Sequence, residues 1–173
     1  MKQELKYEIY PDFPKEEIQF IDMTPSLIDA NTYREILKGI SRTIEQNEEL
    51  LDFDFVISPE ARGFLYAGEI ASHFGVGLVP MRKAGKLPEE VVCSEVYQKE
   101  YGIDKLCILK SNQYLGKKFL FIDDVYATGG TYQVARKLCE QSGAELIGGV
   151  VIATILDFWK QETDLHSLYE IKE

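Results

Sequence analysis

The hydrophobic and polar positions along the chain alternate between helical and extended patterns. Residues 32–35 have the Thr-x-x-Glu pattern of a capping box at the start of a helix. Apolar side chains then recur at helical spacing, at Tyr33, Ile36, Leu37, Ile40 and Ile44. This spacing predicts a first helix from about Thr32 to about residue 48.

Short apolar runs between the helical stretches predict buried strands. Residues 53–58 alternate and then turn apolar, residues 59–63 have the composition of a loop, and residues 64–74 show a second helical face. Residues 76–81 and 106–109 predict two more strands. The local order is therefore strand, loop, helix, strand.

The most apolar short run is Phe-Leu-Phe-Ile at residues 119–122, which is typical of a strand covered on both faces. The prediction ends this strand at Asp123 and Asp124, where a glycine-rich loop begins. A helix closed by Gly143 follows, and residues 146–155 predict the last buried strand of the series.

This alternation predicts an α/β fold with a mainly parallel central sheet flanked by helices. The chain has 173 residues, without internal repeats or a linker, so we expect one domain over residues 1–173. Ligands bind beyond the carboxyl ends of strands in such sheets. The loops at residues 59–63, 82–88 and 123–131 follow predicted strands and can converge on one site.

The charge and the apolar runs exclude several classes of protein. Asp and Glu outnumber Lys and Arg by 29 to 19, and a net charge of -10 disfavours broad nucleic-acid binding. The first five residues are charged without an apolar stretch behind them, and the near-apolar run at residues 146–156 is too short to span a bilayer. We therefore expect a cytoplasmic protein without a membrane partner.

The cysteines and histidines suggest no metal site. Cys93, Cys107 and Cys139 are odd in number and form no Cys-x-x-Cys pair, so we expect all three to be reduced. His73 and His166 are isolated, and His73 lies in an apolar stretch that favours a packed or surface histidine. Neither histidine is assigned a role.

The strongest chemical signal is the doubled aspartate and the loop that follows it. Adjacent carboxylates raise each other's pKa unless cations or hydrogen bonds compensate, so a cation or hydroxyl groups are expected there. The Ala-Thr-Gly-Gly-Thr loop at residues 127–131 opens a helix, and its backbone N–H groups can hold a phosphate. The competing interpretation is a solvated turn with Thr131 as N-cap. The complete string favours the phosphate loop.

This string resembles the phosphoribosyl-diphosphate signature of type I phosphoribosyltransferases, and other blocks narrow the resemblance to the adenine phosphoribosyltransferase family. The further blocks are residues 11–14, 20–25, 60–64, 82–88 and 100–102, in family order. The resemblance covers about residues 11–156. It implies a type I phosphoribosyltransferase fold with a small N-terminal hood at about residues 1–30, which contributes to the base pocket, and a flexible lid loop.

The resemblance also implies an activity. The family transfers the 5-phosphoribosyl group from phosphoribosyl diphosphate to adenine with Mg²⁺, giving AMP and pyrophosphate in purine salvage, and forms homodimers. Two alternatives stay open: the same reaction on hypoxanthine, guanine or xanthine, and a regulator that binds phosphoribosyl diphosphate without catalysis. The net charge and the space before Pro11 argue against a regulator with a nucleic-acid-binding domain.

Site roles follow from the resemblance by position. Asp123 and Asp124 would contact the ribose hydroxyls and, through water, the metal. The 5-phosphate would bind Ala127, Thr128, Gly129, Gly130 and Thr131. The pyrophosphate would bind Arg62, Arg82, Lys83 and Lys86. The resemblance allows a second subunit to contribute part of the basic loop (residues 82–88). The alternative for this loop is a solvated charge run.

The base end and the lid have further implied roles. Phe20 would stack on the purine, with an ordinary core phenylalanine as the alternative. Glu100 would be a catalytic residue that assists proton movement, and Tyr101 would shield the reaction under the lid; a solvated Glu100 is the alternative. The resemblance also implies a cis peptide between Glu60 and Ala61.

Three positions depart from the family pattern. Ile21 stands where relatives often have Arg, Cys107 where Glu is common, and Thr154 in a strand that usually has a sequence close to Val-Glu-Leu. The tail at residues 156–161 also lacks the family's Leu-x-Gly-Arg pattern. These changes lie nearer to the base end than to the phosphate end, so they concern base selectivity more than phosphoribosyl binding.

Overall fold

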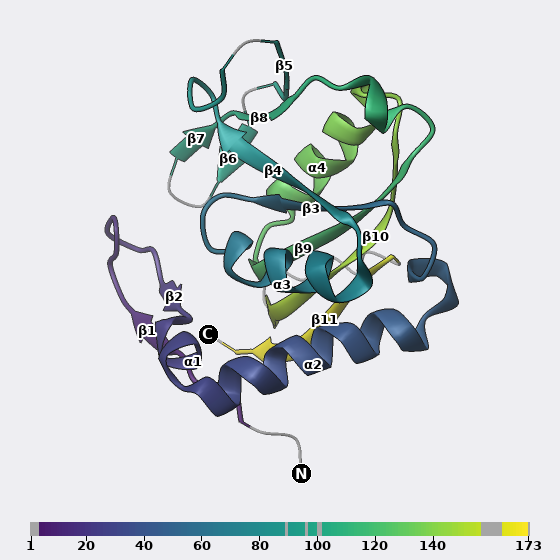
Figure 1. Cartoon of the computed structure of the whole chain (residues 1–173). Helices are drawn as coiled ribbons and strands as arrows, with labels where there is room; N and C mark the ends of the chain where they lie inside the picture. The colour runs from purple at the N-terminus through teal and green to yellow at the C-terminus, as the bar shows by residue number, and fades with distance from the viewer. Residues whose placement is uncertain (1–3, 89, 96, 100–101, 157–163, 173) are drawn as a thin grey trace.

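The computed structural model describes residues 4–88, 90–95, 97–99, 102–156 and 164–172 (Figure 1). The strands are β1 (Glu8–Tyr10), β2 (Phe20–Asp22), β3 (Phe55–Pro59), β4 (Gly77–Lys83), β5 (Val91–Cys93), β6 (Tyr97–Lys99), β7 (Gly102–Asp104), β8 (Leu106–Leu109), β9 (Lys118–Tyr126), β10 (Glu145–Ile155) and β11 (Leu165–Ile171). The helices are α1 (Thr24–Ile28), α2 (Ala30–Gln46), α3 (Phe64–Phe74) and α4 (Gly130–Gln141), with short 3₁₀ turns η1 (Glu48–Leu50) and η2 (Asn112–Tyr114).

The central sheet has seven strands in the order β11-β10-β9-β3-β4-β8-β5. The first five of these run parallel, whereas β8 pairs antiparallel with both β4 and β5. The predicted α/β fold with a mainly parallel sheet is therefore confirmed. Within the described residues, no helix has the length and apolar character needed to cross a membrane.

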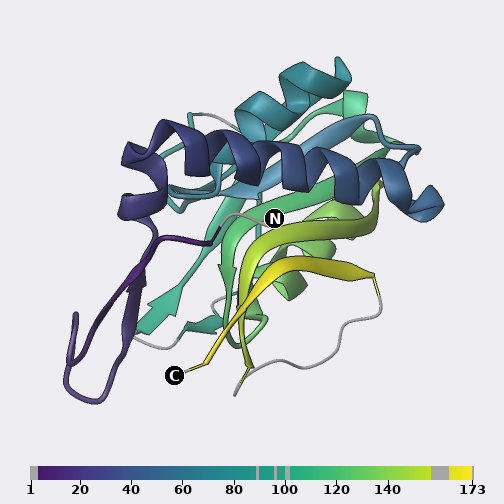
Figure 2. The same cartoon turned by 90° about the horizontal axis from the view of Figure 1, so that it is seen from below.

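Helices cover both faces of the sheet, as Figure 2 shows for α2 on one side and α4 on the other. Side chains of a strand point alternately to the two faces. In β9, Leu120 and Ile122 pack in the core under α2 and α3, while Phe119 and Phe121 pack in the core under α4. All four are buried, which confirms that this strand is covered on both faces.

The first long helix begins two residues earlier than its sequence pattern indicates. The N-cap is Asp29, whose Oδ1 accepts a hydrogen bond from the Thr32 N–H at 2.7 Å, and α2 begins at Ala30. The predicted start at Thr32 is therefore wrong, because Asp29, three residues upstream, caps the helix by accepting the N–H of Thr32 itself. Thr32 itself is 1% exposed and lies inside the helix.

Two strand predictions also need correction. β9 continues through both aspartates to Tyr126 instead of ending at them. β10 is not the last strand, because β11 pairs parallel to it along the sheet edge, with Gly149 opposite Leu165 and Ile155 opposite Ile171. Polar residues inside β9 and β11 interrupt the apolar pattern on which the predictions rested.

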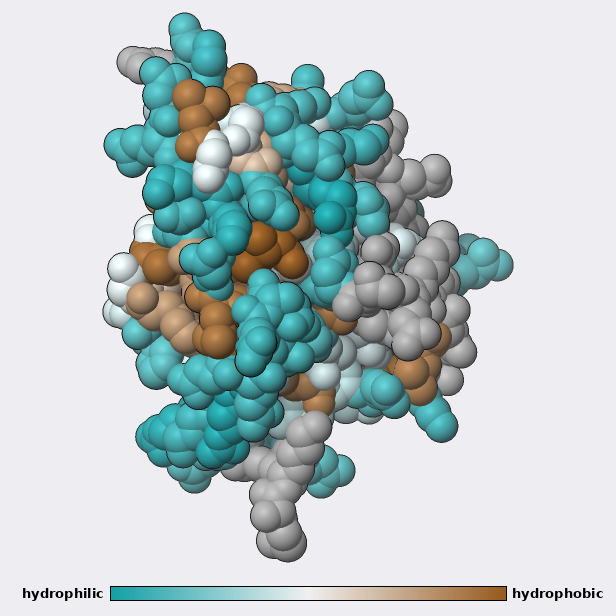
Figure 3. Space-filling view, turned by 90° about the vertical axis from the view of Figure 1, so that its right-hand side faces the viewer, coloured by the Kyte–Doolittle hydropathy of each residue, from teal (hydrophilic) through white to brown (hydrophobic). Residues whose placement is uncertain are grey.

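The described part of the hood contains an antiparallel hairpin of β1 and β2, followed by α1. This hairpin lies at one end of the molecule, beside the amino end of α2 (Figure 1). A second small hairpin is formed by β6 and β7, with Tyr97 opposite Asp104. The face at the right-hand side of Figure 1 is mostly hydrophilic, with some hydrophobic side chains gathered near its centre (Figure 3).

Candidate functional site

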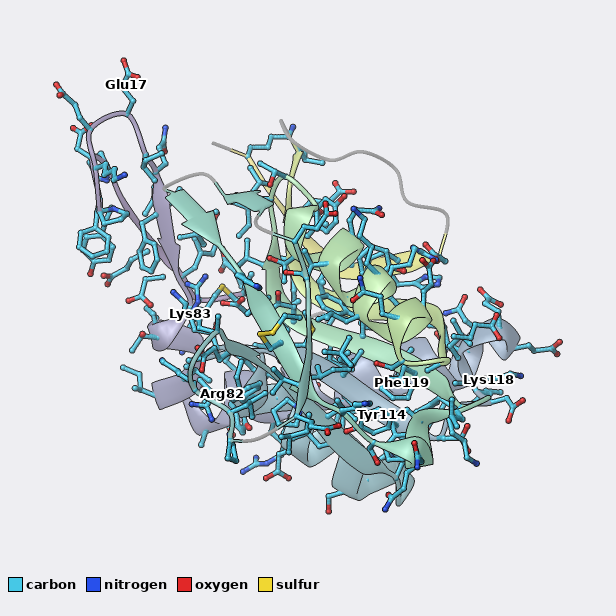
Figure 4. The ribbon with its side chains drawn as sticks, turned by 90° about the horizontal axis from the view of Figure 1, so that it is seen from above. Glu17, Arg82, Lys83, Tyr114, Lys118 and Phe119 are labelled. Atoms are coloured by element: carbon cyan, nitrogen blue, oxygen red, sulfur yellow. A yellow bond between two sulfur atoms is a disulfide. The ribbon has the colours of Figure 1, made fainter. Side chains whose placement is uncertain are left out.

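A cavity of about 500 Å³ opens between the hood and the carboxyl ends of the parallel strands. Its lining comes from residues 17–21 of the hood, residues 59–62 after β3, Lys83 and Lys86, residues 123–132, and Phe121, Val151 and Ile155. The three loops that were expected to converge therefore do line one cavity. Figure 4 shows Arg82 and Lys83 at the end of the sheet near the hood and Lys118, the first residue of β9, at the other end.

Asp123 and Asp124 are buried in the cavity wall near the end of β9, with relative exposures of 9% and 3%. Asp123 Oδ1 accepts a hydrogen bond from the Asp124 N–H at 2.9 Å. Burial, together with the charge of Asp124, raises the pKa of Asp123 well above its usual range. Two carboxyl groups this close together in a buried wall favour a cation or hydroxyl donors beside them.

The loop between β3 and α3 brings Arg62 against this pair. Arg62 Nε lies 2.8 Å from Asp124 Oδ2, its Nη1 donates to the Ile21 carbonyl at 2.9 Å, and its Cζ is 5.1 Å from the centre of the Phe20 ring. One guanidinium therefore joins the strand, the hood and the aromatic ring. Arg62 is 36% exposed and lines the cavity, so it is also accessible to a ligand.

Gly63 lets this loop approach the strand closely. A Cβ atom at this position would collide with the Ser58 hydroxyl and lie 2.9 Å from Asp123 Oδ1. The peptide between Glu60 and Ala61 is cis, as the sequence resemblance implies.

The phosphate loop (residues 127–131) lines the cavity and leads into α4. Gly129 has a φ of 81°, in the left-handed region that favours glycine, and a Cβ atom there would collide with the Tyr126 hydroxyl. The loop therefore follows a path that only glycine allows. Backbone N–H groups at the start of α4 and the helix dipole make this end of the cavity suitable for a phosphate.

The basic residues divide between the cavity and its flank. Lys83 and Lys86 line the cavity, whereas Arg82 lies beside it and pairs with Glu60, with Nε 2.5 Å from Oε2. Arg82 and Lys83 belong to the end of β4 and not to a flexible loop, so that part of the prediction is wrong. β4 extends because its end pairs with β8.

Phe20 lines the cavity from the hood and is half-buried. Its ring packs edge-on against Phe13 at 5.2 Å between ring centres. Phe20 therefore has one side packed in the hood while it also lines the cavity. Glu100 and Tyr101 lie outside the described residues, so their roles stay predictions.

The departures from the family pattern have different surroundings. Ile21 is 4% exposed and packs in the core, although it also borders the cavity. Thr154 is buried, and its hydroxyl lies 3.5 Å from the Tyr169 carbonyl in β11. Cys107 forms a disulfide with Cys93.

The prediction that all three cysteines are reduced is therefore wrong for this pair. Cys93 and Cys107 lie opposite each other in the antiparallel ladder of β5 and β8, an arrangement that their spacing in sequence does not reveal. Cys139 has a free thiol, and burial raises its pKa to about 12.

Sequence reasoning missed several residues of the cavity, among them Glu60 and residues 17–19 of the hood. Glu60 lies close to Arg62 in the block at residues 60–64. An acidic residue so near an expected pyrophosphate-binding arginine could have indicated that Glu60 belongs to the site. Residues 17–19 offered no such signal, because their position depends on the hairpin of β1 and β2.

Comparisons with known proteins agree with this geometry. A model of the phosphoribosyl transferase domain matches residues 29–168. The adenine phosphoribosyltransferase of Caldanaerobacter subterraneus subsp. tengcongensis is 40% identical over 148 residues, which are 86% of this chain and 82% of that protein. The enzyme of the same name from Salinispora arenicola is 43% identical over 142 residues, 82% of this chain and 73% of that protein.

Solved structures show the same likeness. The adenine phosphoribosyltransferase of Thermoanaerobacter pseudethanolicus superposes with a TM-score of 0.82 at 34% identity, covering 95% of each chain. The Saccharomyces cerevisiae enzyme, solved with an imino-altritol bisphosphate and adenine, has a TM-score of 0.80 at 34% identity and covers 88% of this chain and 86% of its own. The chain is a type I phosphoribosyltransferase. Within that class, it belongs to the adenine phosphoribosyltransferase family.

Proposed function

We propose that this protein transfers the 5-phosphoribosyl group from phosphoribosyl diphosphate to adenine, releasing pyrophosphate and giving AMP. The observation that supports this most directly is the position of Arg62, which lines the cavity and contacts both Asp124 and Phe20. Residues 127–131 line that cavity, and so does the aromatic side chain of Phe20. Adenine is the base named for the related enzymes, including the yeast enzyme solved with it.

The phosphate end of the cavity would bind the sugar phosphate. Residues 127–131 would surround the 5-phosphate with backbone N–H groups, and Asp123 and Asp124 would accept hydrogen bonds from the ribose hydroxyls. Lys83 and Lys86 would face the pyrophosphate from the basic loop, and Arg62 would reach it from the other side. Arginine suits this position because its planar group binds oxyanions through two hydrogen bonds.

The site fits a hydrated Mg²⁺ that is bound largely through the substrate. Two buried carboxylates at the cavity wall supply hard oxygen ligands, and the raised pKa of Asp123 reflects a charge that a cation would compensate. No group of three or more His, Cys, Asp or Glu that could hold a metal occurs among the described residues. When bound, Mg²⁺ would neutralise the charge that develops on the leaving pyrophosphate.

The reaction requires charge stabilisation more than covalent chemistry from the protein. Cleavage of the bond between C1 and oxygen leaves a highly anionic pyrophosphate and a cation-like sugar. Preorganised cations at Arg62, Lys83 and Lys86 would stabilise the leaving group, with Arg82 close to them. Glu100 would move a proton on the purine, and Tyr101 would help to exclude water.

The protein would act in the cytoplasm as a homodimer, as the family resemblance implies. Its net charge of -10 is unfavourable for a nucleic-acid partner. The whole chain would form one domain, with about residues 1–30 as the hood that completes the base pocket.

The test is a coupled pyrophosphate-release assay with phosphoribosyl diphosphate, Mg²⁺ and one base at a time: adenine, hypoxanthine, guanine or xanthine. Turnover with adenine alone is the expected result. Turnover with another base would keep the reaction class and overturn the substrate. Inactivity with all four bases, combined with measurable binding of phosphoribosyl diphosphate, would favour a non-catalytic sensor.

A further inference from the structure

Glu60 is an acidic residue in the wall of a cavity that is proposed to bind a polyanion. It follows Pro59, the last residue of β3, and its side chain is only 7% exposed. A carboxylate repels a second anion, so Glu60 is unsuited to direct contact with pyrophosphate. Any contribution to substrate binding must pass through the groups that Glu60 contacts.

Those groups belong to the basic loop. Glu60 Oε2 lies 2.5 Å from Arg82 Nε, and Glu60 Oε1 accepts the Lys83 N–H at 2.9 Å and lies 3.3 Å from Lys86 Nζ. One carboxylate thus contacts two side chains and one backbone group of residues 82–86. The Glu60 N–H also donates to the Met81 carbonyl at 2.9 Å, which fixes the two segments to each other through the backbone.

The buried Glu60 carboxylate is stable only while it keeps these contacts. Burial raises the pKa of the Glu60 carboxyl, but the bonds from Arg82, the Lys83 N–H and Lys86 outweigh it, and the net pKa lies below its usual range. A buried carboxylate that loses such partners is strongly destabilised. Glu60 and the basic loop are therefore one structural unit.

The contacts with Glu60 do not use all the N–H donors of the cationic side chains. The bond to Glu60 occupies Nε of Arg82, one of five N–H donors of a guanidinium. Lys86 is 54% exposed and its contact with Glu60 is the longest of the three, while the Lys83 contact uses only its backbone. Arg82 and Lys86 therefore keep further side-chain N–H donors for a ligand.

On this basis, and resting on the proposed function, we propose that Glu60 is a positioning residue that holds Arg82, Lys83 and Lys86 at the cavity for binding pyrophosphate. It restricts the basic loop to conformations that face the ligand. Without it, three cations would be free to spread into solvent, and the ligand would have to order them on binding.

This role and a simple charge effect predict opposite results. Glu60→Gln removes one negative charge near a polyanion site with little change in size. If Glu60 acted only through its charge, the variant would bind phosphoribosyl diphosphate more tightly. If Glu60 positions the cations, the variant binds more weakly, because a neutral amide holds Arg82 and Lys86 less strongly than a carboxylate does.

The experiment measures kcat and the KM for phosphoribosyl diphosphate at saturating adenine and Mg²⁺, together with product inhibition by pyrophosphate. We expect Glu60→Gln to raise the KM and the inhibition constant of pyrophosphate about tenfold, the effect of weakening one charge-assisted hydrogen bond. We expect kcat to stay within about threefold. A KM that is unchanged or lower would overturn the proposal, as would a loss in kcat alone.

Glu90→Gln is the matched control, because Glu90 is 79% exposed and pairs with Lys110 outside the cavity. It should leave the KM unchanged. Glu60→Asp keeps the charge on a shorter side chain and should give an intermediate KM; it also serves if Glu60→Gln does not fold. In an Arg82→Met background, the effect of Glu60→Gln should shrink, whereas full additivity would contradict an action through Arg82.

The proposed function is tested separately by the unmodified protein. If that protein does not turn over phosphoribosyl diphosphate with any base, the proposed function fails. If it is active and Glu60→Gln behaves like Glu90→Gln, only the role of Glu60 fails.

Discussion

Asp123 and Asp124 are neighbours in sequence, but their surroundings differ. Asp124 has a cationic partner, since Arg62 Nε lies 2.8 Å from its carboxylate. Asp123 accepts a hydrogen bond from the Asp124 N–H, and burial is the largest influence on its pKa. At the scale of single residues, Asp124 therefore has a cation beside it, whereas burial disfavours the charged form of Asp123.

Asp124→Asn should reduce turnover by about 10²- to 10³-fold, the usual loss when one preorganised polar contact at a reaction centre is removed. The substitution removes a charge without changing volume, so the fold should persist. Steady-state kinetics and far-UV circular dichroism measure the two properties. Asp52→Asn, at a side chain that is 88% exposed, is the control and should leave both unchanged. Turnover of Asp124→Asn near that of the control would exclude the assigned role.

Asp123→Asn should instead raise stability while it lowers activity. The pKa of Asp123 is higher in the folded protein than in the unfolded chain. At a pH between these two pKa values, the folded protein therefore keeps a proton that the unfolded chain has released. The contribution of Asp123 to stability is thus full below the unfolded pKa and is lost as pH rises through the folded pKa. The variant should gain on the order of 1 kcal/mol at pH 8.

Chemical denaturation of the Asp123→Asn variant and the unmodified protein at several pH values measures this difference. The gain should shrink as the pH falls toward the unfolded pKa of an aspartate. An equal gain at every pH, or a loss of stability at pH 8, would show that the Asp123 charge is compensated in the folded protein.

Between elements, the disulfide of Cys93 and Cys107 joins β5 to β8 beside the pairing of β8 with β4. The two cysteines are 14 residues apart, and a bond closing a loop of this length stabilises a fold by about 3 kcal/mol. A reductant or Cys93→Ser should therefore lower the free energy of unfolding by about that amount. Urea denaturation with and without reductant measures it.

Thiol counts give an independent check. The denatured, unreduced protein should show one reactive thiol, from Cys139, and the reduced protein should show three. The stability of Cys93→Ser should not respond to reductant. Three thiols without reductant would contradict the disulfide.

The elements differ in how far the sequence predicts them. Continuous apolar runs identified β8, the first half of β9 and most of β10, because those parts of the sheet are buried. β11 was missed because partly buried polar residues such as Ser167 interrupt its pattern at the sheet edge. The start of α2 was misplaced because Thr32 and Asp29 both offer a capping side chain, and only the folded backbone selects between them.

The same holds for the site: parts that are close in sequence were predicted, and parts that meet only in the folded sheet were not. The aspartates and the phosphate loop lie close together in the sequence, so one short segment predicts both parts of the candidate site. The pairing of Glu60 with Arg82 joins residues 22 positions apart, and it depends on β3 and β4 being neighbours in the sheet. No local pattern contains that register.

At the scale of the whole molecule, an acidic chain concentrates cations at one place. The net charge is -10, yet Arg62, Lys83 and Lys86 all line the same cavity. Glu60 and Asp124 line the same cavity and pair with Lys86 and Arg62, respectively. This arrangement limits attraction for polyanions in general and reserves it for a ligand that fits the cavity.

A ligand that binds only the folded chain at this cavity should stabilise the entire domain. At a hundredfold excess of phosphoribosyl diphosphate with Mg²⁺ over its dissociation constant, the gain is about 2.7 kcal/mol. For a chain of this size, this gain should raise the midpoint of thermal unfolding by about 5–10 °C. Thermal scans at increasing ligand concentration measure the shift, with ribose 5-phosphate as a control that lacks the pyrophosphate. Because the cation cluster is proposed to bind pyrophosphate, the control should give a clearly smaller shift, and equal shifts would contradict that proposal.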